Sequence, residues 1–132
     1  MTNHVLIAEP NTDLARTWAC VLEDLDIRVS FAKTSEEAER LLRLDPVDAM
    51  VISLDLPEGG AVNLADFALY RCPNARVIFV TAKGVYADGS IFKLSYNASA
   101  YLQADTAPED MAAIVQYHAA SSASRPCGAY HA

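Results

Sequence analysis

The amino-acid sequence predicts an α/β domain of three layers, in which one parallel sheet lies between two layers of helices. Three observations favour this fold class. Five short apolar segments have the length of buried strands, helix-patterned segments separate them, and the alternation extends over most of the 132 residues. Such alternation favours parallel strands joined by right-handed crossovers, with helices on both faces of the sheet. A chain of this length forms one domain.

The predicted strands differ in how completely they are apolar, and this difference indicates their order. Val5–Ala8 in the first and Ile78–Val80 in the fourth are apolar throughout, which is typical of central strands buried on both faces. The second alternates apolar and polar residues and the fifth is partly polar, so we expect these two at the edges. This arrangement agrees with the flavodoxin-like strand order 2-1-3-4-5. The predicted strands are Val5–Ala8, Ile27–Ala32, Ala49–Ser53, Arg76–Thr81 and Ser99–Leu102.

Five helices are predicted from apolar residues at helical spacing and from capping signals. We expect the folded domain to span residues 1–120, followed by a flexible tail over residues 121–132, where Ala, Ser, Pro and Gly dominate. The predicted helices are Thr12–Leu25, a segment from the capping box Thr34–Glu37 to Pro46, Val62–Arg71, a short segment from Asp88, and a segment that begins at Pro108.

The chain is acidic, with 10 Lys and Arg against 17 Asp and Glu and a formal net charge of −7 at pH 7. Such a charge repels nucleic acid and anionic lipid, so we expect neither as a partner. The first nine residues lack the basic leader of a signal peptide. No apolar run approaches the roughly 20 residues that cross a bilayer. We therefore expect a soluble, cytoplasmic protein.

Ligands of such a fold bind at the carboxyl ends of the strands, near the switch point between the first and third strands. The first of these loops, Glu9–Asp13, contains no glycine. A dinucleotide fingerprint or a phosphate-binding loop therefore cannot form there. The loop also lacks the Ser, Thr and Gly pattern for a flavin phosphate and the His for cobalamin. We expect no cofactor.

Four segments, in this order, resemble the receiver domain of bacterial two-component response regulators, and the resemblance covers about Val5 to His118. They match the family's first strand with its acidic pair, third strand with its Leu-Pro loop, fourth strand with its switch hydroxyl, and fifth strand with its switch aromatic. The matching segments are Val5–Pro10, Val47–Pro57, Val77–Ala82 and Ala98–Leu102.

The resemblance implies four chemical roles, and this sequence departs from most of them. In receivers an acidic pair holds Mg²⁺, an aspartate becomes an acyl phosphate, a Thr or Ser follows the phosphoryl group, and a lysine contacts it. The acidic pair corresponds here to Glu9 and Pro10, so one carboxylate is missing. The phosphoacceptor position is Ser53, and the lysine position is Ala104. Thr81 and Tyr101 keep the pattern, at switch positions.

These departures predict a degenerate receiver that binds no metal and is not an enzyme. A serine hydroxyl needs a base to attack a phosphoryl donor, whereas a carboxylate is already ionised at neutral pH. Mg²⁺ requires carboxylate oxygens, and Glu9 is the only matched one. The alternative is an active receiver that uses Asp55, two residues beyond Ser53, with Mg²⁺. A simpler interpretation gives these residues no chemical role. The polar groups at the strand ends, Glu9, Ser53 and Thr81, then only form structural hydrogen bonds or face solvent, and Tyr101 is an edge-strand aromatic.

The resemblance also implies how such a domain acts. Receivers generally signal through the surface of their fourth helix, fifth strand and fifth helix. We therefore expect a protein partner from a signalling system, with a homodimer as a further possibility. The residues expected on this surface are Thr81, Ser90, Lys93, Tyr101 and Gln103.

Overall fold

A computed structural model describes residues 3–57, 60–81, 98–103 and 105–123. It contains one parallel sheet of order β2-β1-β3-β4-β5, so the predicted strand order and both predicted edge strands are confirmed. The strands are β1 (His4–Ala8), β2 (Arg28–Ala32), β3 (Ala49–Ser53), β4 (Arg76–Thr81) and β5 (Ala98–Gln103). The helices of the described residues are α1 (Thr12–Glu23), α2 (Ser35–Leu44), α3 (Gly60–Arg71) and α4 (Pro108–Ala123).

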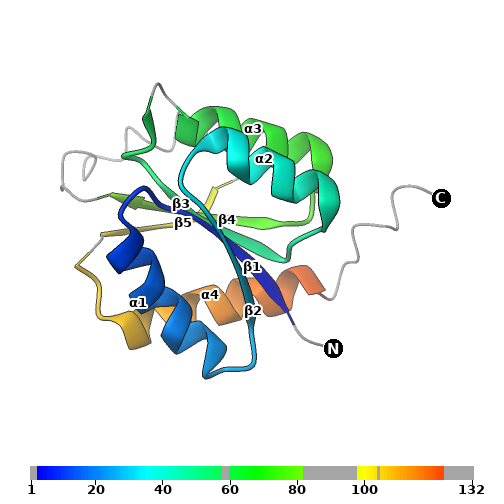
Figure 1. The fold of residues 1–132 in the computed structure, drawn as a ribbon. Coiled ribbons are helices and arrows are strands. Elements are labelled where there is room, and N and C mark those ends of the chain that lie inside the picture. The colour runs from blue at the N-terminus through cyan, green and yellow to red at the C-terminus, as the bar shows by residue number, and fades with distance from the viewer. Residues whose placement is uncertain (1–2, 58–59, 82–97, 104, 124–132) are drawn as a thin grey trace.

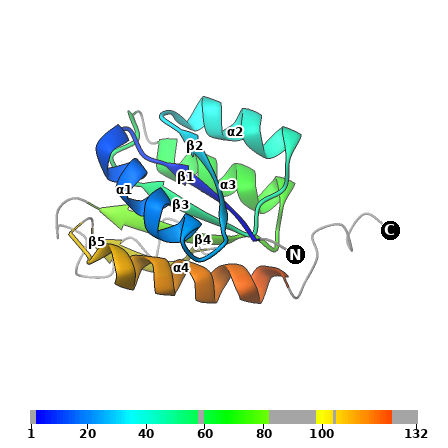
Figure 2. The same cartoon turned by 60° about the horizontal axis from the view of Figure 1, so that its bottom comes forward.

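The helices form the two outer layers of a three-layer sandwich, as the sequence predicts (Figure 1). α2 and α3 cover one face of the sheet, where they pack on Leu6, Met50 and Phe79. α1 and α4 lie beside each other on the opposite face, against Ile7 and Val51 (Figure 2). All residues of β1 and β3 are buried, whereas β2 has exposed and half-buried positions. The alternation in β2 therefore reflects its place at the edge.

Side-chain caps begin the first two helices. The Asn11 side chain accepts hydrogen bonds from the backbone N–H groups of Asp13 and Leu14, at 3.1 and 3.3 Å. Thr34 accepts one from the backbone N–H of Glu37, at 3.1 Å. The Glu37 carboxylate in turn accepts from the backbone N–H of Lys33, at 2.7 Å. These bonds satisfy N–H groups that a helix start leaves without an intrahelical partner.

Some helix limits differ from the predicted ones. α1 ends at Glu23 rather than Leu25 because the following turn includes Asp26 in the left-handed region, at φ 63°. α3 begins at Gly60, where an added Cβ would lie 3.1 Å from Ser35 Oγ, so the missing side chain permits close approach to α2.

The last described helix also differs from its prediction. α4 continues to Ala123, past the expected start of a tail at residue 121, because alanine and serine are compatible with a helix. Residues 124–132 of that expected tail lie outside the described residues, as does the helix expected from Asp88. Within the described ranges, no helix is long and apolar enough to span a membrane.

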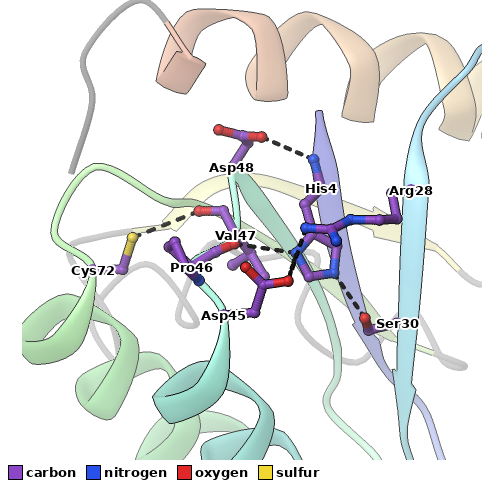
Figure 3. Close-up of polar contacts among 8 residues, drawn as sticks. All are labelled: His4, Arg28, Ser30, Asp45, Pro46, Val47, Asp48 and Cys72. Carbon is purple, nitrogen blue, oxygen red and sulfur yellow. Dashed lines mark hydrogen bonds and ion pairs between the residues drawn. The ribbon is translucent and has the colours of Figure 1, made fainter. Parts of the chain in front are cut away.

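A polar network joins the amino ends of the strands, opposite the predicted site (Figure 3). The His4 ring is buried, and its Nδ1 lies 3.1 Å from the Pro46 carbonyl oxygen while its Nε2 lies 2.7 Å from Ser30 Oγ. The His4 backbone N–H donates to Asp48 at 2.8 Å. Arg28 and Asp45 form an ion pair at 2.8 Å. These bonds connect β1, β2 and the segment before β3, so this edge of the sheet has a structural role.

Candidate functional site

The carboxyl edge of the sheet brings together three residues singled out from the sequence. Ala8 of β1 pairs with Ile52 of β3, so Glu9 follows at the level of Ser53. Ser53 pairs in turn with Val80 of β4, and Thr81 is the last residue of that strand. Because β1, β3 and β4 are adjacent and parallel, Glu9, Ser53 and Thr81 lie at one edge, where the fold class predicts the site.

Glu9 is a buried carboxyl group, with only 5% of its surface exposed. Burial raises its pKa, because the charged form loses solvation. Hydrogen bonds from the Asn11 backbone N–H, at 3.0 Å, and from the Ser53 hydroxyl oppose this rise in the pKa of Glu9. The carboxylate of Asp55 adds to it by charge repulsion. The outcome is a raised pKa, so the surroundings of Glu9 disfavour its charge.

Ser53 occupies the end of β3 with 1% of its surface exposed. Its hydroxyl oxygen accepts a hydrogen bond from the backbone N–H of Asp55, at 3.1 Å. The hydroxyl also hydrogen bonds to the side chain of Glu9. The two imidazoles of the described residues, His4 and His118, lie at the start of β1 and in α4, away from this edge. The buried Ser53 hydroxyl therefore has two hydrogen-bond partners, the Asp55 backbone and the Glu9 side chain.

Asp55 lies in the turn that follows β3, and its side chain is exposed. It is close enough to raise the pKa of Glu9, so the two carboxylates share one electrostatic environment. The structure thus places Asp55, the alternative acceptor, near Glu9 but on the surface.

The residues of this edge do not fit a tightly bound Mg²⁺ ion. Mg²⁺ takes oxygen ligands in a near-octahedral arrangement and is usually held by one or two charged carboxylates. Here the buried carboxyl of Glu9 has a raised pKa, and Pro10 has no ligand atom in its side chain. In the described part of the chain, no three His, Cys, Asp or Glu side chains are grouped so that they could hold a metal ion.

Tyr101 is on β5, in register with Phe79 of β4. The two rings are stacked, with centroids 5.5 Å apart and an interplanar angle of 21°. Tyr101 is half-buried and packs on the α2 and α3 side, and burial raises the pKa of its hydroxyl. Thr81 pairs with Gln103 at the carboxyl ends of β4 and β5. Tyr101 therefore lies on the face of the sheet, with Leu102 between it and the carboxyl end of β5.

Some predicted positions lie outside the described residues, and one contributor was not predicted. Ala104, Ser90 and Lys93 fall in the ranges that the structure does not describe. Asn11 caps α1 with its side chain, and its backbone N–H also donates to the Glu9 carboxylate. Its position two residues after Glu9 is a signal for such a turn, because short loops return a backbone N–H toward the preceding side chain.

Comparisons with known proteins give no match in sequence and many in structure. No family model and no curated protein matches the sequence. The chain is similar to a CheY-like response regulator receiver domain from Methanospirillum hungatei JF-1, with a TM-score of 0.83, 20% identity and coverage of 96% of this chain and 100% of the other. It is also similar to a response regulator from Thermotoga maritima, with a TM-score of 0.80, 19% identity and coverage of 91% and 99%.

A third similar structure is the solution structure of the beryllofluoride-activated NtrC4 receiver domain dimer. Its TM-score is 0.78 with 22% identity, and the match covers 90% of this chain and 98% of that one. The matches span most of both chains and agree with the observed strand order. The chain therefore has the fold of a CheY-like response regulator receiver domain.

Proposed function

We propose that this chain is a cytoplasmic receiver-like module of a two-component system that is not phosphorylated and acts by binding a protein. One observation carries the proposal. The residue at the phosphoacceptor position is Ser53, and its buried hydroxyl is bonded to the Asp55 backbone and to Glu9. A nucleophile in this position has neither the charge nor the exposure that attack on a phosphoryl donor requires.

The surroundings of Ser53 support the same proposal. Phosphoryl transfer depends on cations that neutralise charge on the transferred group. The residues matched to the family's site, Glu9, Ser53 and Thr81, supply carboxyl and hydroxyl groups, and the lysine position of the family is Ala104 in the sequence. The cations Arg16 and Lys33 line a pocket with Glu9, but neither Ser53 nor Asp55 lines that pocket. The negative charge of a transferred phosphoryl group would therefore add to the existing repulsion between Glu9 and Asp55. We accordingly propose that the chain is not an enzyme.

The proposed binding surface includes the carboxyl half of β4 and β5. Tyr101 presents a half-buried ring supported by Phe79, and such rigid aromatic anchors are favoured at protein interfaces. Thr81 and Gln103 add polar groups at the adjacent strand ends. The net charge of −7 favours a protein partner over nucleic acid or a membrane. The dimer of the similar NtrC4 domain makes a second copy of this chain one candidate partner.

The alternative proposal is an active receiver that uses Asp55, and the exposure of this side chain favours it. A phosphodonor in solution can reach an exposed carboxylate, and Asp55 interacts electrostatically with Glu9. Acceptance of a phosphoryl group at Asp55 would nevertheless need a cation between these two carboxylates, as in Mg²⁺-dependent transfer. The two proposals therefore differ in their response to Mg²⁺.

A Mg²⁺ titration tests the proposed function. The amide chemical shifts near Glu9 and the fluorescence of Trp18, the single tryptophan, are followed at millimolar Mg²⁺, with an ordinary receiver as positive control. The proposal predicts no saturable change in this chain. A saturable change that is lost in Asp55→Asn and retained in Asp66→Asn, an exposed aspartate on α3, would instead support the active receiver.

A further inference from the structure

A pocket of about 230 Å³ lies beside Glu9, between the first turns of α1 and the carboxyl end of β2. This volume is below the roughly 300 Å³ at which pockets for drug-sized ligands begin, so it suits a compact ligand. Its lining residues are Glu9, Thr12, Ala15, Arg16, Phe31, Ala32 and Lys33.

The pocket combines an apolar wall with two cations. Ala15 and Ala32 are buried, and Phe31 is 48% exposed although phenylalanine is normally buried. Arg16 and Lys33 are both exposed. The ion pairs within the described residues join His4 and Arg28 to Asp45, so neither pocket cation is neutralised by an ion pair there.

Two carboxyl groups, those of Glu9 and Glu37, already accept hydrogen bonds from backbone N–H groups. Glu9 accepts the Asn11 backbone N–H and hydrogen bonds with Ser53, and its raised pKa disfavours a negative charge. Glu37 accepts the backbone N–H of Lys33 at 2.7 Å. The pocket is therefore mostly apolar, and two of its lining residues are exposed cations in a chain of net charge −7.

We propose that this pocket binds a compact aromatic carboxylate. The ring of the ligand packs on Phe31 and the alanines, and its carboxylate accepts hydrogen bonds from Arg16 and Lys33. The site goes beyond the proposed function, because it involves no phosphoryl group and holds whether or not the chain can be phosphorylated.

Titration of the full chain with benzoate, phenylacetate and cinnamate tests the site, with neutral benzamide as the matched control. Amide chemical shifts and calorimetry measure binding up to about 10 mM, tenfold above the millimolar dissociation constant expected for such small ligands. We expect at least one carboxylate to bind saturably, with shifts confined to α1 and the end of β2. Benzamide should bind at least about tenfold more weakly, because it lacks the charge.

Two double variants with the same net charge distinguish binding by the pocket cations from a general effect of net charge on ligand affinity. Arg16→Gln with Lys33→Gln should weaken the best carboxylate by at least about tenfold. Arg40→Gln with Arg43→Gln, two exposed residues of α2 that do not line the pocket, should leave its affinity within about twofold. Phe31→Ala, with its fold checked by circular dichroism, should also weaken binding.

Three results would overturn the proposal. One is no saturable binding by any of the three carboxylates, which would leave the pocket to a side chain of a protein partner or empty. Another is equal binding of benzamide, and the third is an equal loss of affinity in both double variants. None of these results depends on Mg²⁺ or a phosphodonor, so failure here is distinct from failure of the proposed function.

Discussion

The Ser53 hydroxyl hydrogen bonds to the side chain of Glu9 across the adjacent strands β3 and β1. Both residues are almost completely buried, and burial leaves Glu9 with a raised pKa. In a receiver the same positions hold the phosphoacceptor and part of the Mg²⁺ site. Here a hydroxyl and a carboxyl group occupy these positions, and the hydrogen bond between them satisfies two buried polar side chains.

Replacement of Ser53 by aspartate should destabilise the fold rather than create a working acceptor. The new carboxylate would be buried at a position with 1% exposure, beside Glu9 and near Asp55. We expect Ser53→Asp to lower the free energy of unfolding by about 2–4 kcal/mol. Ser53→Ala, which removes only the hydrogen bonds, should lower it by about 1 kcal/mol. Urea unfolding measures both, and equal stability of Ser53→Asp and the unchanged chain would contradict the expectation.

Glu9 should make the stability depend on pH. Because burial raises its folded-state pKa above the ordinary value of 4.5, the unfolded chain loses this proton first as pH rises. Stability associated with protonated Glu9 is therefore present at low pH and lost as pH rises through the folded-state pKa. Glu9→Gln should stabilise the fold more at about pH 7 than at about pH 4.

Unfolding free energies at the two pH values check this dependence on Glu9. The matched control is Glu36→Gln, which changes an exposed glutamate in the first turn of α2. A stabilisation by Glu9→Gln that is the same at both pH values, or larger at low pH, would show that burial does not disfavour the charge of Glu9.

The stack of Tyr101 on Phe79 should contribute to the stability of the β4 and β5 pair. Tyr101→Ala removes a ring whose centroid lies 5.5 Å from that of Phe79, and we expect a loss of about 1–3 kcal/mol. Tyr101→Phe keeps the ring and should lose about 1 kcal/mol or less. Chemical unfolding separates the two variants. Equal losses would assign the stabilisation to the hydroxyl rather than to the ring.

The hydrogen bonds of His4 at the amino edge of the sheet should contribute as much to the free energy of unfolding as a buried apolar side chain does. His4→Ala leaves the Pro46 carbonyl and the Ser30 hydroxyl without their ring partners, at a site where His4 is 6% exposed (Figure 3). We expect a loss of about 2–4 kcal/mol, against about 1 kcal/mol for Ser30→Ala. Thermal unfolding of both variants measures the difference, and a stable His4→Ala would argue against a structural role.

The sequence predicts the sheet well because its signals are strong and local. Strands β1 and β4 contain continuous apolar runs, Val5–Ala8 and Val77–Val80, and the alternation in β2 correctly indicates an edge. The end of α1 was predicted two residues too late, because Leu25 continues the apolar stripe while the backbone already turns at Asp26. Periodicity alone does not report a left-handed residue.

The candidate site could be predicted only in part. Parallel strands end at one edge, so the meeting of Glu9, Ser53 and Thr81 follows from the predicted strand order. The hydrogen bond from the Asn11 backbone and the burial of Glu9 depend on the exact turn after β1. The pocket beside Phe31 depends on the packing of α1 against an edge strand, and no sequence pattern reports such spacing.

Intact mass spectrometry, with acetyl phosphate and Mg²⁺ under conditions that modify an ordinary receiver, tests the central claim most directly. The account predicts an unchanged mass, because Ser53 is a buried hydroxyl that already accepts a hydrogen bond from the Asp55 backbone, and because the family's lysine position is Ala104 in the sequence. A gain of one phosphoryl mass that is abolished by Asp55→Asn, or by Ser53→Ala, would contradict it and make the chain an active receiver.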